Sequence, residues 1–350
     1  MVEWKKLGEV ANLVRGRVIS KDYIRDFEGE YPVYSSQTAN DGVLGSINSY
    51  MFDGEYLTWT TDGAYAGTIF RRKGKFSITN VCGLIDITCR NIKQDFLYFW
   101  LSKTAKDYVL EGMGNPKLMS NVASTILIPI PSLSEQTRIV GILDTFSSAI
   151  DNLKEQIAQR RKQYEYYRDQ LLDLEGKPGV EMKTLGEVAN VLRGKRLTKN
   201  MLDDDAPYPV FHGGIEPLGF YNQYNREANT VMVINVGASA GTVGYCDRLF
   251  WSSDGCFCIS HSDLLQSKYL YYYLETKTHY LQSQVRHAGI PTLDNPVVER
   301  VSIPLLPIPE QQHIVSILDT FEASIQNLEA QLKEREKQYE YYRNKLLTFE

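Results

Sequence analysis

The chain has 350 residues, of which 43% are hydrophobic and 23% charged, and its formal net charge is −5 at pH 7. These proportions are typical of a globular protein, and the length accommodates two domains of ordinary size with further elements. The negative charge argues against a protein that coats nucleic acid. Contact with DNA would therefore need local basic patches or a basic partner.

No apolar run in the sequence approaches the roughly 20 residues that a membrane-spanning helix needs. The five cysteines are odd in number and unevenly spaced, so they form neither a disulfide framework nor a zinc pattern. We therefore expect a cytoplasmic protein with reduced thiols, no membrane contact and no metal site.

The first segment of the chain returns in its second half. Residues 7–12 read Leu-Gly-Glu-Val-Ala-Asn, as residues 185–190 do, and each copy is followed by Arg-Gly and a basic residue. The offset between the later matched motifs varies along the chain, so we expect two globular segments with the same fold and with insertions or deletions between them. These further matches are 31–34 with 208–211, 63–68 with 237–242, 96–101 with 269–274, and 128–131 with 306–309.

Each globular segment combines predicted strands with predicted helices. The runs 56–60 and 230–234 are rich in β-branched and apolar residues and lie among Gly, Asn and Asp turns, as strands do. The aromatic runs 96–101 and 269–274 indicate buried helix faces, with stacking on a ligand as the alternative. We predict an α+β protein with two mixed α/β domains, at 1–133 and 176–309, and an internal two-fold repeat.

Two longer segments, 134–175 and 310–350, are predicted to be helices, and a Gly/Pro linker follows the first at 176–179. They match at one constant offset, as Glu135 and Glu310 do. Apolar residues recur with a 3.5-residue period, which is typical of helices wound into a coiled coil. Arg160 and Arg335 occupy the one position of each seam that is not apolar. A homodimerisation coiled coil is the alternative, but the matched lengths favour a pair that fixes the separation of two domains.

The usual motifs of catalysis are missing from the sequence. It contains no phosphate-binding G-x-x-x-x-G-K-[ST] loop, no G-x-G-x-x-G after a strand and no [ND]-P-P-[YF] motif of amino-methyltransferases. The five histidines lack metal-binding spacing, and no Cys/His pair is present in both halves. We therefore expect a protein that binds, with no catalytic residue and no cofactor of its own.

Positions that differ between the halves, beside matched words, indicate what is bound. Short polar side chains on loops can hydrogen-bond base edges, and Arg and Lys can anchor phosphates. Loops that are polar without binding anything are the alternative, and a solvated hairpin tip is the alternative for the basic run 71–75. The candidate DNA-contacting residues are Ser35, Ser36, Gln37, Thr38, Thr61, Asp62, Tyr65, Arg71, Arg72 and Lys117, and then His212, Asn235, Ser239, Arg286 and Thr292.

Taken together, the repeated words resemble the specificity subunit of type I restriction-modification systems over the whole chain. The resemblance rests on the Leu-Gly-Glu-Val start, the Tyr-Pro-Val strand, the Gly-Ala-x-x-Gly segment, the [Ile/Asn]-Pro-x-Leu loop and the Glu-Gln and Ile-Leu-Asp words of each helix. It implies two target-recognition domains held apart by two antiparallel helices, each domain reading part of a split sequence on double-stranded DNA.

The resemblance also implies partners. These are two modification subunits, which carry S-adenosylmethionine and methylate adenine, and restriction subunits. The family supplies no catalytic residue to this chain, in agreement with the missing motifs. Because the chain is short for the family, we expect compact recognition domains with short loops.

Two other classes of function are compatible with the residues alone. One is a coiled-coil adaptor whose two domains bind proteins or glycans, and it would have no affinity for DNA even beside methyltransferase partners. The other is an enzyme with duplicated sites, which the lack of a paired acid/base or nucleophile set disfavours. The preferred interpretation is a non-catalytic DNA-recognition subunit.

Overall fold

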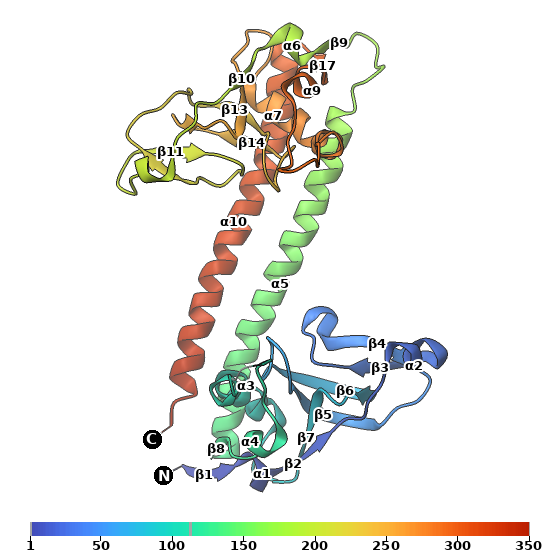
Figure 1. Ribbon diagram of the computed structural model, residues 1–350. Coiled ribbons are helices and arrows are strands. Elements are labelled where there is room, and N and C mark those ends of the chain that lie inside the picture. The colour runs from blue at the N-terminus through green and yellow to red at the C-terminus, as the bar shows by residue number, and fades with distance from the viewer. Residues whose placement is uncertain (1, 112–113, 350) are drawn as a thin grey trace. The chain divides into compact units, whose positions relative to one another are not determined.

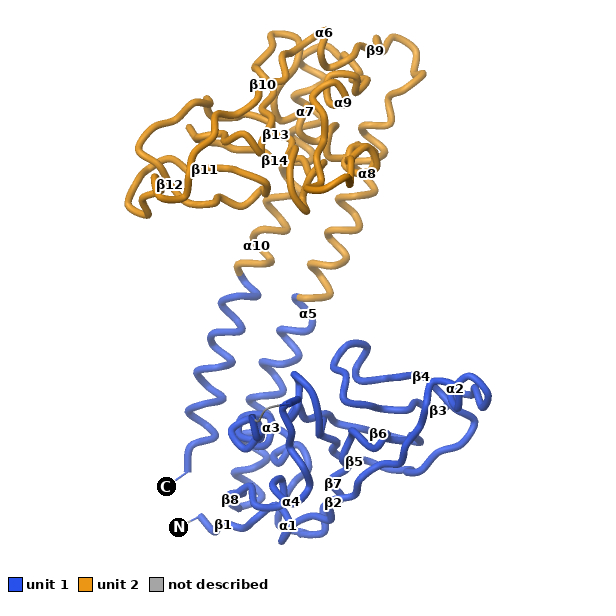
Figure 2. Tube along the Cα trace, in the orientation of Figure 1, with its two compact units in different colours: residues 1–153, 331–350 blue, residues 154–330 orange. Residues whose placement is uncertain are grey.

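The structure, a computed structural model, describes residues 2–111 and 114–349 (Figure 1). The chain divides into two compact units, Met1–Leu153 with Gln331–Glu350, and Lys154–Ala330 (Figure 2). Each unit contains one globular domain and one half of each of two long helices. The domain boundaries predicted after residues 133, 175 and 309 follow the sequence repeat and stay predictions.

The first globular domain is built on a six-stranded sheet. Neighbouring strands are antiparallel except β3 and β6, which pair in parallel. β6 joins the two halves of the sheet, because most of its length pairs with β5 while Ser77 and Ile78 pair with β3. The strand order is β2 (Ala11–Arg15), β7 (Cys82–Ile87), β5 (Phe52–Thr60), β6 (Ile69–Ile78), β3 (Glu28–Tyr34) and β4 (Val43–Ile47).

Short helices and a separate strand pair complete this domain. β1 (Glu3–Lys6) pairs antiparallel with β8 (Leu127–Ile130), so the start of the domain is tied to the strand that leads into the first long helix. The helices are α1 (Leu7–Val10), α2 (Lys21–Asp26), α3 (Gln94–Thr104) and α4 (Ser120–Ala123), with 3₁₀ turns η1 (Ala39–Gly42) and η2 (Ala105–Tyr108).

The second domain repeats this topology with one difference. The equivalent of β6 is broken, because β14 (Val243–Cys246) ends before β15 (Trp251–Ser252) begins, and the sheet therefore separates into two. One sheet has the order β10 (Val191–Arg193), β16 (Cys256–Ile259), β13 (Thr230–Ile234) and β14. The other has β12 (Gly219–Tyr221), β11 (Tyr208–Phe211) and β15, with β11 and β15 parallel.

The remaining elements of the second domain also match the first. β9 (Glu181–Thr184) pairs antiparallel with β17 (Ser302–Leu305), as β1 pairs with β8. The helices are α6 (Leu185–Val188), α7 (Ser267–Thr276), α8 (Thr278–Ser283) and α9 (Asn295–Glu299), and η3 (Lys199–Met201) is a 3₁₀ turn.

The predicted aromatic helices form the centre of each domain core. α3 buries Phe96, Leu97, Phe99, Trp100 and Leu101 against the sheet, and α7 buries Tyr269, Leu270, Tyr272, Tyr273 and Leu274. The predicted strands at 56–60 and 230–234 lie within β5 and within β13, whose residues are all buried. Core packing is therefore the role of these aromatic runs.

The two long helices are α5 (Leu133–Leu172) and α10 (Ile308–Leu346). In the first unit the start of α5 packs on the end of α10, where Phe146 stacks on Tyr342 with ring centroids 5.2 Å apart. In the second unit the end of α5 packs on the start of α10, where Tyr167 stacks on Phe321 at 5.4 Å. The pairing is antiparallel in both units, as the resemblance implied.

The arginines that interrupt the predicted seam have the same surroundings in each unit. The guanidinium carbon of Arg335 lies 5.8 Å from the ring centroid of Phe146, and that of Arg160 lies 5.9 Å from Phe321. A guanidinium group over an aromatic face is attracted by the ring electrons. The seam can therefore accept arginine here because the opposite helix supplies a phenylalanine.

Candidate nucleic-acid interface

Four candidates of the first domain lie together where the turn between β5 and β6 meets the segment before α4. The Thr61 hydroxyl donates to Asp62 (2.5 Å), and the Asp62 carboxylate lies 3.8 Å from the ammonium group of Lys117. The backbone N–H of Leu118 donates to the carbonyl of Thr61 (2.9 Å), which joins the two segments. Tyr65 lies in the same turn and is 57% exposed. This site combines cationic, anionic and phenolic groups.

The polar segment after β3 consists of four half-buried candidates: Ser35, Ser36, Gln37 and Thr38. The Thr79 hydroxyl donates to the Ser35 hydroxyl (3.1 Å), and the Gln37 amide donates to the backbone carbonyl of Val43. Two residues beyond Thr79, the carbonyl of Val81 accepts from the backbone of Thr61 (3.1 Å). The turn 79–82 thus connects this segment with the group around Thr61.

Arg72 is almost fully buried, at 3% exposure, and supports the same region from inside. Its guanidinium carbon lies 3.6 Å from the ring centroid of Tyr34, and its nitrogens bind Asp41 (2.7 Å) and Thr58 (3.2 Å). These contacts indicate that Arg72 holds the 39–42 turn. Its direct contact with DNA stays a prediction.

Arg71 is held between elements of the first unit. It binds Asp95 of α3 (2.9 Å) and Asp144 of α5 (3.1 Å), and its guanidinium carbon lies 4.2 Å from the ring centroid of Tyr98. The run 71–75 lies along β6 in register with residues 53–57 of β5, so it is not a hairpin tip. These contacts favour a scaffolding role for Arg71, and its contact with DNA also stays a prediction.

Three candidates of the second domain, Asn235, Ser239 and Thr292, occupy the positions equivalent to Thr61, Tyr65 and Lys117, and a fourth, Arg286, stands where the first domain has Leu110. The backbones of Arg286 and Thr292 form a two-bond ladder (2.9 and 3.0 Å), and the carbonyl of Asn235 accepts from Leu293 (2.9 Å). Ser239 lies in the turn that follows β13. Here Thr292 stands in place of Lys117 and Val236 in place of Asp62, so the second group has an amide, two hydroxyls and a guanidinium group but no lysine or aspartate at these positions.

A cavity of about 580 Å³ adjoins this group in the second domain. The side-chain oxygens of Asn235 and Asn295 are buried and have no hydrogen-bond partner, although both residues line the cavity. The equivalent positions of the first domain hold Thr61 and Ser120, which lack the amide group. The other lining residues are Val191, Arg193, Phe257, Thr292, Leu293, Asp294 and Pro296.

His212, the remaining candidate, follows β11 and lies beside the same group. Its ring Nδ1 is 3.4 Å from the carboxylate of Asp254. A Cβ atom on Gly255 would lie 2.7 Å from that ring nitrogen and 2.7 Å from a methyl carbon of Val236, so glycine allows both loops to approach closely. The structure thus gathers one group of candidates at the turn after β5 in the first domain and at the turn after β13 in the second, whereas Arg71 and Arg72 lie along β6.

The repeated Arg-Gly-basic word contributes residues that the candidate set omitted. A Cβ atom on Gly16 would lie 2.3 Å from the carbonyl oxygen of Ile78, and one on Gly194 would lie 1.9 Å from that of Ser253. Each glycine therefore lets exposed cations pack against the turn between β6 and β7 in the first domain, or between β15 and β16 in the second. The repetition of this word in the sequence was the signal that could have identified them. The cations are Arg15, Arg17, Arg193 and Lys195.

The described part of the chain contains no cluster of three or more His, Cys, Asp or Glu side chains arranged to hold a metal ion. Burial raises the pKa of the Cys82 thiol to about 12, and burial also raises the pKa of Cys246. These two thiols are therefore protonated near neutral pH.

Comparison with known proteins decides the family. The model of the type I restriction modification DNA specificity domain matches residues 1–160 and again residues 178–336. The chain belongs to the type I DNA specificity family. The two matches correspond to the two halves that the sequence repeat defines, and each includes most of one long helix.

Relatives of this specificity chain agree with the assignment. A protein of Mycoplasma pneumoniae assigned as a type I specificity subunit is 32% identical over 357 residues, covering 98% of this chain and 97% of the relative. The specificity subunit of the type I restriction enzyme MpnII, from the same organism, is 41% identical over 169 residues, covering 47% of this chain and 51% of the relative.

Solved structures show the same fold. The crystal structure of a type I restriction-modification S subunit from M. genitalium matches with a TM-score of 0.74 and 17% identity, covering 100% of this chain and 97% of that one. A chain from a study of assembly and conformational transition of the type I system matches with a TM-score of 0.59 and 20% identity, covering 99% and 96%. The predicted fold class, two α+β domains with a pair of long helices, is therefore confirmed.

Proposed function

We propose that this specificity chain reads a bipartite sequence on double-stranded DNA and directs adenine methylation and restriction by partner subunits. The observation that carries the proposal is that the two domains have the same topology but place different polar side chains at equivalent positions. Each domain places a group of polar candidates at the equivalent turn, after β5 or after β13, yet the groups differ: Asp62 and Lys117 in the first, Asn235 and Thr292 in the second. Two equivalent sites with different chemistry suit two different half-sites.

Phosphate contact and base contact would come from different residues. The exposed cations that flank Gly16 and Gly194, such as Arg17 and Lys195, suit phosphate oxygens, which position a protein on DNA without reading its sequence. The amide and hydroxyl groups suit base edges in the major groove, where each base pair presents its own donors and acceptors. With a net charge of −5, the chain would depend on partners for part of the phosphate contact.

The partners we propose are two modification subunits, which bind S-adenosylmethionine and methylate adenine, and restriction subunits, all in the cytoplasm. The chain itself would need no cofactor. The two long helices support two equivalent partner positions, since the sequences of α5 and α10 align at one constant offset without a gap.

Methylation-aware sequencing tests this proposal. The chain is expressed with its modification subunit in a host that lacks both, and the methylated positions of the host DNA are mapped. We expect one split motif methylated on adenine, and no methylation with either chain alone. Methyl transfer by the isolated chain, or a continuous motif, would contradict the proposal.

Exchange of one domain tests the assignment of half-sites. Replacing residues 1–131 with the corresponding domain of a relative should change one half of the methylated motif and leave the other half unchanged. A change in both halves, or in neither, would exclude independent reading by the two domains.

A further inference from the structure

The aspartate of the repeated Leu-Asp-Thr-Phe word binds its own globular domain in both units, but through different cations. In the first unit, Asp144 of α5 binds the guanidinium group of Arg71, which comes from β6 (3.1 Å). In the second unit, Asp319 of α10 binds the ammonium group of Lys268, which comes from α7 (2.6 Å). The two aspartates are equivalent by the sequence repeat, whereas the two cations are not.

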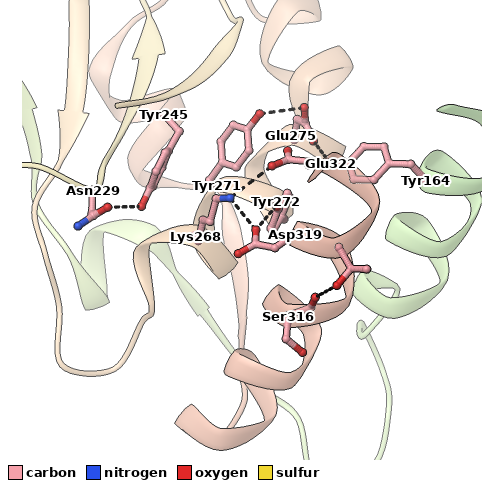
Figure 3. A network of polar contacts seen from close by, with 11 residues as sticks. Tyr164, Asn229, Tyr245, Lys268, Tyr271, Tyr272, Glu275, Ser316, Asp319 and Glu322 are labelled. Atoms are coloured by element: carbon pink, nitrogen blue, oxygen red, sulfur yellow. Dashed lines mark hydrogen bonds and ion pairs between the residues drawn. The ribbon is translucent and has the colours of Figure 1, made fainter. Parts of the chain in front are cut away.

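The sequence repeat shows that the two cations stand at different positions of their domains. Tyr245 stands at the strand position of Arg71, and Lys268 stands at the helix position of Asp95. The second domain therefore has a tyrosine where the first has its cation, and a cation where the first has an acid. Figure 3 shows Lys268 and Tyr245 on neighbouring elements of the second domain, with the ammonium group 5.9 Å from the ring centroid of Tyr245.

The second acid has moved as well, so that each unit keeps one cation between two carboxylates. In the first unit the cation also binds Asp95 (2.9 Å), which lies on the domain helix α3. In the second unit it also binds Glu322 (3.3 Å), which lies on the long helix α10 where α5 has Ser147. The net charge of the cluster is the same in both units, although only the aspartate keeps its place.

Aromatic side chains of the domain helix complete each cluster. In the first unit the guanidinium carbon of Arg71 lies 4.2 Å from the ring centroid of Tyr98 and 4.9 Å from that of Phe99. In the second unit the phenol of Tyr272, which replaces Phe99, donates to the Asp319 carboxylate (2.5 Å), as Figure 3 shows. The added hydroxyl gives this aspartate a second donor where an ammonium group replaces the forked guanidinium group.

The electrostatics of the second cluster show that the ion pair outweighs burial. Burial lowers the pKa of Lys268, but its hydrogen bond to Asp319 and the charges of Glu322 and Asp319 raise it, and the net shift is upward. The ammonium form is therefore favoured although its side chain is only 27% exposed.

We propose that Asp144 and Asp319 each hold a recognition domain on its long helix by binding a cation that the domain supplies. We call each of these ion pairs a latch; the aspartate keeps its position in both units, and the cation does not. The cation can stand at the strand position of Arg71 or at the helix position of Lys268. A domain that is placed on either helix would need a cation at one of these positions. These are positioning residues, and the inference does not depend on what the domains bind.

The decisive test moves the second arrangement into the first unit of the full-length chain. Arg71→Tyr alone leaves Asp95 and Asp144 without their cation, and Asp95→Lys alone leaves two cations competing for Asp144. The double variant R71Y/D95K places tyrosine and lysine at the positions of Tyr245 and Lys268, and Asp144 is then the partner of the lysine because Ser147 stands where α10 has Glu322. Hydrogen–deuterium exchange of the peptides that cover α3 and β6 is the measurement, because it reports local opening while the second domain serves as an internal reference.

We expect R71Y to speed exchange in α3 and β6 by about tenfold, and the double variant to return it to within about twofold of the original chain. Lys73→Tyr is the matched control, because Lys73 lies on the same strand but pairs only with Glu55 at the surface and has an 83% exposed side chain. This control should leave exchange unchanged.

The latch proposal would be overturned if R71Y/D95K exchanged as fast as R71Y, because the two cation positions would then not be interchangeable. It would equally be overturned if R71Y had no more effect than the Lys73 control. Should R71Y prevent folding, the reciprocal set Y245R/K268D/E322S in the second unit provides the same comparison against K268D/E322S, which lacks the cation, with α7 and β14 as the reporters. Recovery in the larger set supports the proposal, and its absence contradicts it.

Discussion

Gln136 of α5 and Gln311 of α10 make the same three hydrogen bonds, each within its own unit. The Gln136 oxygen accepts from the backbone of Lys93 (2.8 Å), and its nitrogen donates to Asn91 (2.8 Å) and Pro131 (2.9 Å). The Gln311 oxygen accepts from Gln266 (2.8 Å), and its nitrogen donates to the carbonyls of residues 264 (2.9 Å) and 306 (2.8 Å). Both side chains are fully buried.

Replacing either glutamine should destabilise its unit. Gln136→Ala leaves one backbone donor and two carbonyls without a partner, and each unmade bond costs about 1 kcal/mol or more, so we expect a loss of roughly 2–4 kcal/mol. Chemical denaturation of the full chain measures the loss. Gln312→Ala, an exposed neighbour of Gln311, is the control and should change stability by less than about 0.5 kcal/mol. If Gln136→Ala changed stability no more than this control, the three repeated hydrogen bonds would contribute nothing to stability.

A methyl group has no room at Gly83. Its Cβ atom would lie 2.2 Å from the ring of Trp59, a buried side chain whose indole nitrogen donates to the carbonyl of Leu118 (2.9 Å). Gly83→Ala must displace this ring, and we expect it to destabilise the first unit by about 1–3 kcal/mol. Quenching of tryptophan fluorescence should also change, because the indole moves.

Gly141 of α5, unlike Gly83, has room for a methyl group. It lies inside the helix, and its Cβ position meets no atom within 4 Å. Gly141→Ala should therefore stabilise the chain by about 0.5–1 kcal/mol, because alanine loses less backbone entropy in a helix than glycine. In thermal unfolding, Gly141→Ala should raise the unfolding temperature and Gly83→Ala should lower it. A lower unfolding temperature for Gly141→Ala would contradict the prediction.

Lys117 and Gln37 should affect DNA binding in different ways. Lys117→Ala removes an exposed cation, so affinity in the complex with the modification subunit should fall for all sequences, and the salt dependence should weaken by about one unit of slope. Lys73→Ala serves as the control. If Lys117→Ala changed the preferred sequence with no change of salt slope, Lys117 would read a base.

Gln37→Ala should relax base choice without that change of salt slope. The Gln37 amide donates to the carbonyl of Val43, so its loss frees the segment after β3. Mapping methylated motifs at one half-site measures the effect. An unchanged motif would remove Gln37 from the candidates.

The entry to α6 should be sensitive to acid. Hydrogen bonds from the Thr184 hydroxyl (2.6 Å) and backbone N–H (2.6 Å) lower the pKa of Glu187 from 4.5. A lowered carboxyl pKa means that the stability it contributes is present above its unfolded pKa and is lost as pH falls through its folded pKa. The difference in unfolding temperature between the original chain and Glu187→Gln should therefore shrink below about pH 4.5. A difference that grows toward acid pH would contradict this sign.

The sequence alone determined that the chain contains two copies of one domain, that each copy combines strands with helices, and that two long helices are present. Matched words such as 7–12 and 185–190 revealed the duplication, and the 3.5-residue period revealed the helix pair. These features are local or periodic, so they can be read without knowing which distant residues meet. Most of the candidate loops were also found this way, because they adjoin matched words.

Only the tertiary structure decided how individual side chains are used. Arg71 and Arg72 are neighbours in a basic run, but successive residues of a strand point to opposite faces. One guanidinium group therefore meets Asp144 on α5, while the other is buried against Tyr34. The sequence repeat shows that Arg71 on β6 and Lys268 on α7 stand at different positions, but only the packing of segments far apart in the chain shows that both bind the equivalent aspartate.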